Sequence, residues 1–492
     1  MPRTYEELMG ALGRAMYYRP ERRRVRDLLS RDARPQLLVA GHEYPLFDIS
    51  MNGVSLLLDD GQPELVVGRE TDLTLLLYGR EAYRGRARVA RVEPGPRTSQ
   101  RVGMGLLSGF LDLPAIQHQD DDGRLERAFR FGPEYWRHKI PRPFQEAVTR
   151  AAHFVHHYRK ILDSHEARYR TPGGGGQTAV DALALRALDA LRAPWAEIQT
   201  EASRAAVACL EDRDVLVAAK QMTETLVTSV MMPAPLVTRT YTKPLGYAGD
   251  YQVMLYYYDD QLEGDSVFAK VFHKFGAEHP LSAGVRTRKG YVIEKMTREH
   301  ARVLAGNGPE GAPFAVTSLG CGPGREISGY LAGHHAWPGR VALTLIDQED
   351  QALSIAYHEC QREILSRDLA ASLSCLNLSF IQMLRDPSLV PMEQQQDFIF
   401  STGLFDYLRE STAQSLVLGL YQRLKPGGLL TLGNALGPNE CFWTPEFLVD
   451  WTILYRTRDE MLRLARLLPA SASVDVEVEP GNAYYFLVVR KP

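Results

Sequence analysis

A glycine-rich turn between a strand-like run and a helix-like run most constrains how this chain folds. The apolar, β-branched run 314–319 leads directly into Gly320, Gly322 and Gly324, and an amphipathic segment, 326–332, follows. Glycines let the backbone turn sharply and let a ligand approach the main chain, because no Cβ is in the way. The pattern therefore predicts a strand, a tight turn and a helix beside a small-molecule site.

A carboxylate follows this turn at an informative distance. The next strand-like run, 341–346, ends at Asp347, about 20 residues after the last glycine, where nucleotide-binding α/β folds place an acid that accepts hydrogen bonds from ribose hydroxyls. Further strands are predicted at 396–401 and, after the turn 425–428, at 429–433. The runs 474–479 and 483–490 flank a Pro-Gly turn and predict an antiparallel hairpin that closes a parallel sheet.

On these features, residues about 285–492 resemble the class I S-adenosylmethionine-dependent methyltransferases. The resemblance implies a Rossmann-like, seven-stranded α/β fold with S-adenosylmethionine as cofactor. Gly320, Gly322 and Gly324 would line the methionine and ribose part of that cofactor, and Asp347 would bind both ribose hydroxyls. Two alternatives are a nicotinamide-dependent oxidoreductase on a similar sheet and a sheet that binds no ligand. Dehydrogenases use Gly-x-Gly-x-x-Gly, lack the hairpin and bind a pyrophosphate at a helix N-terminus.

The resemblance also implies roles for other residues. Arg288, with Arg286 as the alternative, would hold the methionine carboxylate of the cofactor. The loop 401–407 would sit where the methyl group is transferred, with Gly403 and Leu404 against the cofactor. The adenine contacts would lie near 380–384, where the family often has an acid and this chain offers Gln382.

The acceptor is left open by the residues themselves. A carboxylate needs no general base, whereas an alcohol or amine does, and Tyr247, Asp250 and Asp406 are the candidates. Strand 396–401 is not followed by Asn-Pro-Pro-Tyr and the chain has no basic excess, which argues against DNA or RNA. The C-terminal half, including 241–250, is similar to bacterial methyltransferases associated with signalling fatty-acid methyl esters. That similarity implies O-methylation of a hydroxy fatty acid or another small apolar carboxylate.

The N-terminal part, 1–115, is predicted to be a small β-barrel or sandwich. Its strand candidates are 36–40, 44–49, 53–58, 64–67, 73–78, 82–92 and 101–107, separated by turn residues. It resembles PilZ domains, which bind cyclic di-GMP through Arg-x-x-x-Arg and Asp-x-Ser-x-x-Gly. The positions that match are Arg22, Arg26, Asp48, Ser50 and Gly53. Arginine pairs bidentately with phosphates, and Arg31 and Arg34 compete for that role.

Between these parts, residues 116–240 are predicted to form a helical module, which would join the barrel to the methyltransferase domain, 241–492, with its core at 300–492. An acidic loop is expected at 118–127, a helix at 143–165, and two helices over 179–228 that break near Pro194. This module is also a candidate surface for a homodimer. If the methyltransferase half is inactive, the chain would instead relay cyclic di-GMP to a protein partner.

Composition narrows the cellular setting. The net charge is −3 and charged residues make up 24% of the chain, which gives no sign of a nucleic-acid binder. Its five cysteines are scattered and include no Cys-x-x-Cys pair, which argues against a disulfide framework and a zinc site. No apolar run approaches the ~18 residues that a membrane span needs. We therefore expect a bacterial cytoplasmic protein without metal or transmembrane segment.

Overall fold

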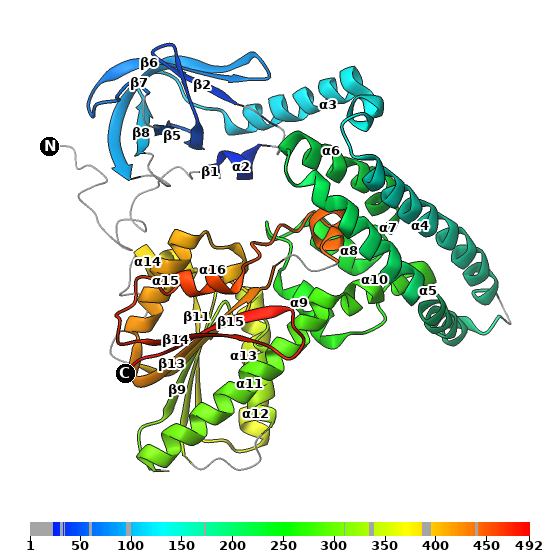
Figure 1. Ribbon diagram of the computed structural model, residues 1–492, viewed down its shortest axis with the longest axis vertical. Helices are drawn as coiled ribbons and strands as arrows, with labels where there is room; N and C mark the ends of the chain where they lie inside the picture. Colours follow the sequence, from blue (N-terminus) through cyan, green and yellow to red (C-terminus); the bar gives the residue numbers. More distant parts are fainter. Residues whose placement is uncertain are drawn as a thin grey trace. The chain divides into compact units, whose positions relative to one another are not determined.

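The computed structural model describes residues 23–29, 33, 35–58, 62–94, 100–171, 174–308, 310–333, 339–385, 395–437 and 441–492. The chain divides into two compact units, Met1–Ile140 and Pro141–Pro492 (Figure 1). The division into three parts at residues 115 and 240 stays a prediction, because the compact units cut the chain once, after Ile140.

The first unit is built on an antiparallel sheet. Its elements are β1 Arg23–Arg24, α2 Val25–Leu28, β2 Gln36–Val39, β3 His42–Tyr44, β4 Leu46–Ser50, β5 Gly53–Leu58, β6 Glu70–Leu77, β7 Arg80–Pro94, β8 Gln100–Leu106 and α3 Leu113–Arg137. The eight strands pair in the order β1-β4-β5-β8-β7-β6-β2-β3. Alternate residues of β6 are buried, as in a sheet with one face on a core. Within the described residues no pairing joins β3 to β1, so a closed barrel is not shown.

Two expectations for this unit are wrong. The strand at 64–67 is a turn region, because Val66 and Val67 are exposed and Gly68 has a φ of 85°. The acidic loop at 118–127 is part of α3. There Asp120 accepts a 2.7 Å hydrogen bond from the Tyr78 hydroxyl, and Gly123 lies so close to the Tyr78 ring that a Cβ would clash with it. These contacts with the sheet override the loop preference of an Asp-Asp-Asp-Gly sequence.

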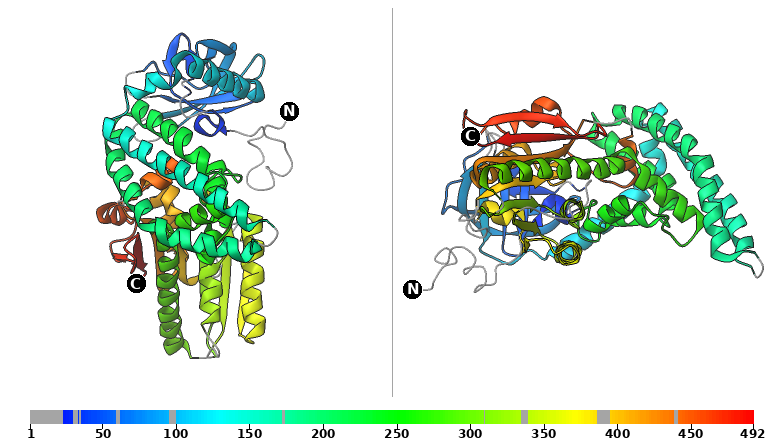
Figure 2. Two further views of the ribbon diagram at one scale, coloured as in Figure 1. Left: turned by 90° about the vertical axis from the view of Figure 1, so that its right-hand side faces the viewer. Right: turned by 90° about the horizontal axis from the view of Figure 1, so that it is seen from below.

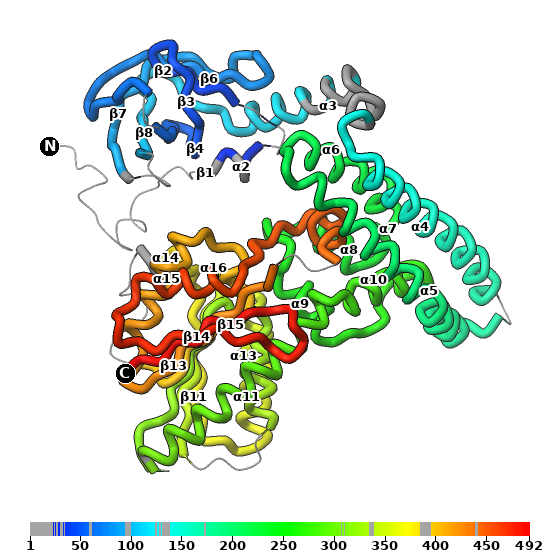
Figure 3. Tube along the Cα trace, in the orientation of Figure 1, coloured from blue at the N-terminus to red at the C-terminus, as the bar shows by residue number. Residues whose placement is uncertain are grey.

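The second unit begins with helices and small helical turns. They are α4 Arg142–Tyr169, α5 Gly176–Ala206, η2 Val207–Cys209, α6 Arg213–Thr223, η3 Glu224–Thr228, α7 Ser229–Met231, α8 Pro235–Thr242, α9 Tyr251–Asp259, α10 Val267–Glu278 and α11 Pro280–Asn307. The long helices α4 and α5 run side by side (Figure 3). Within the described residues no helix is long and apolar enough to cross a membrane.

The helix predicted at 143–165 is confirmed by α4, but the break near Pro194 is wrong. Helix α5 continues through Pro194, and the interruption comes at 207–212 instead. A proline inside a helix costs about 3 kcal/mol. Burial of the next residue offsets that cost, because Trp195 packs on Phe272 and Trp443 with ring centroids 5.4 and 6.3 Å apart.

The rest of the second unit is a seven-stranded sheet with flanking helices, which confirms the predicted α/β sheet. The strands are β9 Phe314–Leu319, β10 Val341–Asp347, β11 Ala371–Asn377, β12 Gln396–Ser401, β13 Leu424–Ala435, β14 Ser473–Val478 and β15 Tyr484–Arg490. The connecting elements are α12 Arg325–Ala332, α13 Asp350–Ser366, α14 Phe380–Arg385, η5 Phe405–Tyr407, α15 Glu410–Gln422, η6 Thr444–Leu448 and α16 Arg458–Arg463.

Strand order creates one special position in this sheet. The order is β11-β10-β9-β12-β13-β15-β14, with the first five strands parallel and β15 antiparallel to β13 and β14. The terminal hairpin, drawn in red, lies along the sheet edge (Figure 2). Chain order reverses between β9 and β12, both buried at every residue. In open α/β sheets, ligands bind outside the carboxyl ends of the strands at such a switch point.

Candidate functional site

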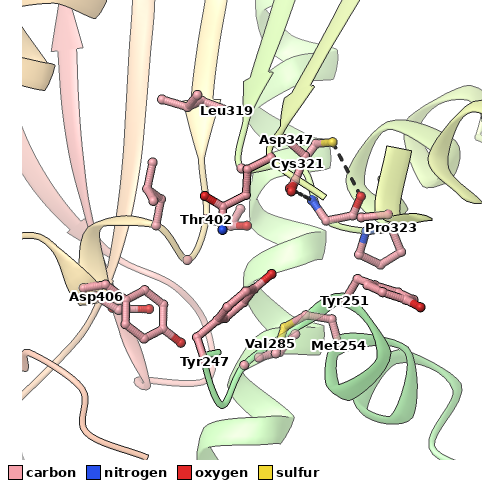
Figure 4. A pocket seen from close by; sticks show the side chains of 18 of the residues that line it. Tyr247, Tyr251, Met254, Val285, Leu319, Cys321, Pro323, Asp347, Thr402 and Asp406 are labelled. Atoms are coloured by element: carbon pink, nitrogen blue, oxygen red, sulfur yellow. Dashed lines mark hydrogen bonds between the residues drawn. The ribbon is translucent and has the colours of Figure 1, made fainter. Parts of the chain in front are cut away.

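A cavity of about 340 Å³ lies at this switch point. Its walls come from the carboxyl ends of β9, β10 and β12, from the loop before α9, and from α11. Figure 4 shows Asp347 and Thr402 on one side and Tyr247 and Met254 on the other. The cavity brings together eight of the residues proposed from the sequence: Tyr247, Arg288, Gly320, Gly322, Asp347, Gly403, Leu404 and Asp406.

The glycine turn has the backbone that its sequence predicts. Gly320, Gly322 and Gly324 all have positive φ, at 63°, 52° and 68°, where other residues are strained. Gly320 and Gly322 line the cavity, but Gly324 does not. A Cβ on Gly324 would lie 2.7 Å from the Cβ of Ala356, so this glycine lets α12 and α13 pack closely. Its place is between helices rather than against a ligand.

Asp347 is fixed at the end of β10. Its Oδ2 accepts a hydrogen bond from the Gly322 N–H at 2.8 Å, and its Oδ1 accepts one from the Glu349 N–H at 3.0 Å. Burial raises the pKa of the Asp347 carboxyl, although the backbone hydrogen bonds oppose the shift. A carboxylate oxygen accepts more than one hydrogen bond, so both oxygens keep capacity for a ligand hydroxyl.

Arg288, on α11, brings a buried positive charge to the cavity. One of its terminal nitrogens donates to the Thr402 carbonyl at 3.0 Å, and the guanidinium lies 4.4 Å from the centroid of the Tyr484 ring. Its Nε is buried and has no hydrogen-bond partner among the described residues. Gly403 makes room for this group, since a Cβ there would lie 3.2 Å from the guanidinium. Because Arg288 lines the cavity, its guanidinium could pair with an anion bound there.

The alternative arginine, Arg286, is placed differently. Its guanidinium donates to the carbonyls of Tyr257 and Ala277 at 2.8 and 2.9 Å, and it does not line the cavity. These bonds link α9, α10 and α11. The geometry therefore favours Arg288 for ligand binding.

Asp406 is the buried carboxylate nearest to Arg288. Its Oδ1 accepts a 2.7 Å hydrogen bond from the Ala435 N–H, and its Oδ2 lies 4.0 Å from Arg288. Burial raises the pKa of Asp406 to about 6, against the opposing effects of Arg288, that backbone bond and Arg456. At neutral pH the carboxylate is therefore largely ionised and ready to accept a proton.

The two other candidate bases differ in position. Tyr247 lines the cavity, and burial raises the pKa of its hydroxyl, as do the nearby carboxylates of Glu349 and Asp347. Asp250 does not line the cavity. Its carboxylate caps α9 by accepting from the Gln252 and Val253 N–H groups, and it pairs with Arg239 at 2.8 Å.

Several lining residues were not identified from the sequence. Glu326, at the start of α12, is buried and accepts a 2.8 Å hydrogen bond from the Tyr258 hydroxyl. Trp451 donates a 2.8 Å hydrogen bond to the Tyr407 hydroxyl, and both lie against Gly249. The sequence does carry a signal for Glu326, since it lies two residues after Gly324, the last glycine of the turn. Trp451 lies in an irregular segment without a motif, so only the fold brings it here.

The region proposed for adenine is partly in place. Leu378, Ser379 and Phe380 line the cavity after β11. Gln382 does not, because it caps α14: its Oε1 accepts from the Ser379 N–H at 2.9 Å, and its N–H donates to the Ser379 hydroxyl at 3.2 Å. The cavity is therefore lined here by the aromatic Phe380 and the aliphatic Leu378, and not by the acid that the methyltransferase family often has in this region.

Three of the candidate cyclic di-GMP residues, Asp48, Ser50 and Gly53, lie on the β4–β5 hairpin. Asp48 is buried and pairs with Arg101 of β8, which also lies 4.7 Å from the centroid of the Phe47 ring. The Ser50 hydroxyl donates to the Gly53 carbonyl at 3.2 Å. Arg26 lies on α2, its side chain is outside the described residues, and so are Arg22, Arg31 and Arg34.

The sequence matches no family model and no curated protein. The fold is similar to solved structures, though weakly. Magnesium protoporphyrin IX methyltransferase from Synechocystis PCC 6803 with bound S-adenosylhomocysteine is 10% identical, with a TM-score of 0.32 over 52% of this chain and 100% of that one. N-methyltransferase NodS from Bradyrhizobium japonicum WM9, also with S-adenosylhomocysteine, is 17% identical, with a TM-score of 0.28 over 42% and 88%. A possible exported protein from Bordetella parapertussis is 18% identical, with a TM-score of 0.38 over 52% and 86%.

Proposed function

We propose that the unit Pro141–Pro492 is an S-adenosylmethionine-dependent methyltransferase that acts on a small molecule. The observation that carries this proposal is the cavity at the switch point, where the glycine turn, Asp347 and Arg288 meet. When bound there, the cofactor would supply a methyl group on an already activated sulfonium. Arg288 would hold its methionine carboxylate through the guanidinium, and Asp347 its ribose hydroxyls.

The same cavity disfavours a dinucleotide. A pyrophosphate needs the positive end of a helix, and α12 is the helix that follows the glycine turn. Its first turn carries Glu326, whose buried carboxylate lines the cavity. A pyrophosphate at the start of α12 would lie beside the Glu326 carboxylate, and like charges in a site of low polarity repel each other, so a nicotinamide cofactor fits less well there.

We further propose that the acceptor is a carboxylate, such as that of a hydroxy fatty acid. Within the described residues no lysine or histidine lines the cavity. Burial raises the pKa of Tyr257 to about 12 and also raises that of Tyr247, so both phenols stay protonated at neutral pH. Neutral phenols are hydrogen-bond donors that suit an anion, and an ionised acceptor needs no base. The chain would then mainly align the acceptor and exclude water.

Replacing Asp406 with asparagine tests this acceptor class. A general base contributes about 10²- to 10⁴-fold, so loss of a true base lowers kcat by that amount. For a carboxylate acceptor we expect kcat to decrease by less than about tenfold, because Asp406 then acts only by pairing with Arg288 and not as a base.

The pH profile of the unaltered protein gives an independent check of the acceptor class. A base with the pKa of Asp406 would halve activity at about pH 6 on acidification. If the acceptor is instead a carboxylic acid that reacts in its ionised form, the midpoint of the pH profile lies at about pH 4–5, where such acids ionise.

The activity itself is testable without knowing the acceptor. The protein is incubated with a whole bacterial cell extract and methyl-labelled S-adenosylmethionine, and the labelled small molecules and nucleic acids are analysed by mass spectrometry. The proposal expects a labelled methyl ester and S-adenosylhomocysteine. Label on nucleic acid alone would contradict the small-molecule acceptor, and binding without any product would favour an inactive relay protein.

We also propose that the first unit binds cyclic di-GMP. Support comes from Asp48, Ser50 and Gly53, which lie together on one hairpin beside the partly exposed Arg101 and Phe47. We expect the messenger to raise the melting temperature of the full chain and Arg26→Ala to abolish that shift, because arginine forks pair with phosphates. Methylation without messenger should persist in the variant. An equal shift in both proteins would contradict the role of Arg26, and no shift in either would contradict binding.

A further inference from the structure

Behind one wall of the cofactor cavity lies a second, smaller cavity of about 30 Å³. Three side chains, those of Tyr257, Leu281 and Trp451, line both cavities. The Tyr257 and Trp451 rings are nearly parallel, at 7°, with centroids 6.3 Å apart. Leu281, the aliphatic member, comes from the first turn of α11. We call this set the shared wall.

The second cavity is mostly apolar. The rest of its lining comes mainly from α5, α7, α8, α10 and η6, which contribute Met231, Leu236, Val237, Phe272, Phe275 and Leu448 among others. Burying an aliphatic group against such side chains is favourable by about 0.8 kcal/mol per methylene. A space of this size exceeds the ~10–15 Å³ that a single water needs.

The polar side chains around the second cavity already form hydrogen bonds within the protein. Gln199 donates to the Thr444 hydroxyl at 2.7 Å, and Ser282 donates to the Gly276 carbonyl at 2.7 Å. The His279 ring interacts with the Cys441 carbonyl at 3.0 Å and accepts from the Leu281 N–H at 3.2 Å. A polar group entering here would lose its water without gaining these partners, so the cavity suits an apolar group.

The lining of the second cavity also includes an unusual helical turn. Thr444, Pro445 and Leu448 belong to η6, a π-helical turn, and the Leu448 carbonyl accepts a 2.7 Å hydrogen bond from the Thr228 hydroxyl. Thr228 is the last residue of η3, which is also π-helical and packs against η6. Single π turns often occur at functional sites, because the extra residue reshapes the helix surface.

We propose that the second cavity receives the apolar end of the acceptor, which passes between the side chains of the shared wall, while the group to be methylated lies beside the cofactor in the first. The shared wall then sets how long the acceptor can be, and the satisfied polar groups select against a polar end. This inference rests on the proposed methyltransferase function and adds to it a site for substrate length.

Leu281→Ala tests the inference, because it opens the shared wall while both aromatic rings remain. Methylation is measured with a homologous series of straight-chain carboxylic acids. Each additional buried methylene is worth about fourfold in kcat/KM, so we expect the preferred acid to become longer by about two carbons or more. Leu416→Ala is the matched control, since this buried leucine lies outside both cavities and should leave the preference unchanged.

Gly276→Ala makes the opposite change. Gly276 lies in the last turn of α10 and lines the second cavity, and an added Cβ would lie 2.9 Å from Leu236, another lining residue, so the methyl group takes up space there. We expect this variant to prefer shorter acids than the unaltered protein does.

The outcomes separate the two proposals. If the protein methylates acids but Leu281→Ala and Gly276→Ala share its length preference, the second cavity has no role and the methyltransferase proposal stands. If S-adenosylhomocysteine binds and no acid is methylated, both the acceptor class and this inference are overturned. An acid with a terminal hydroxyl that reacts as well as its apolar counterpart would also contradict the inference.

Discussion

Replacing Arg288 with methionine is expected to weaken S-adenosylhomocysteine binding at least thirtyfold. Truncating one partner of a buried, hydrogen-bonded charge pair costs about 2–5 kcal/mol, and about 2 kcal/mol corresponds to thirtyfold. Arg288 is 4% exposed and is the only arginine among the described lining residues. Equilibrium dialysis with labelled S-adenosylhomocysteine measures the effect.

A matched control makes this result specific. Lys289, the next residue on α11, has its ammonium 5.4 Å from the centroid of the Tyr258 ring and does not line the cavity. Lys289→Met removes the same charge from the same helix and should leave binding unchanged. Thermal melting of both variants shows whether the fold is also destabilised when Arg288→Met removes the cation beside the buried Asp406 carboxylate. Binding by Arg288→Met within threefold of the unaltered protein would rule out the proposed carboxylate contact.

Asp347→Ala is expected to weaken the same binding by about 1–3 kcal/mol, or about 5- to 150-fold, the range for hydrogen bonds to a charged group. Part of that loss comes from the turn itself, because the Gly322 N–H loses its acceptor. Asp347→Asn separates the two effects. It retains one oxygen for the turn but cannot accept hydrogen bonds from two ribose hydroxyls at full strength.

Asp350→Ala is the control for Asp347. This exposed residue lies in the first turn of α13, three residues further on, and does not line the cavity. We expect it to bind S-adenosylhomocysteine normally. If Asp347→Ala and Asp350→Ala bind equally well, the ribose contact proposed for β10 is wrong.

Much of the sheet could be predicted because its strands are regular. Strands β9 and β12 begin and end as expected, and each carries apolar residues on both faces of the sheet. The terminal hairpin follows from its alternation and its Pro-Gly turn. Two helical predictions were wrong for the same reason. The helix continues through Pro194 because Trp195 packs on Phe272, and the acidic run is helical because Asp120 bonds to Tyr78. Local patterns do not contain those contacts.

The residues that line the cavity could be predicted where a sequence motif marks the end of a strand. They could not be predicted where loops far away in the sequence complete the cavity. Gly320, Gly322, Asp347 and Gly403 follow strands and line the cavity together. Gly324 belongs to the same motif, but it serves the packing of two helices. Trp451 reaches the cavity from a segment without regular structure. Its position depends on contacts across the whole unit.

The central claim is that the cavity beside the glycine turn binds an adenosyl ligand rather than a dinucleotide. Calorimetric titration of the full chain, with S-adenosylhomocysteine in one experiment and NADH in another, tests it most directly. The account predicts saturable binding of one S-adenosylhomocysteine per chain, weakened at least thirtyfold in Arg288→Met, and no heat of binding with NADH. Saturable NADH binding, or no binding of S-adenosylhomocysteine to the folded protein, would contradict it.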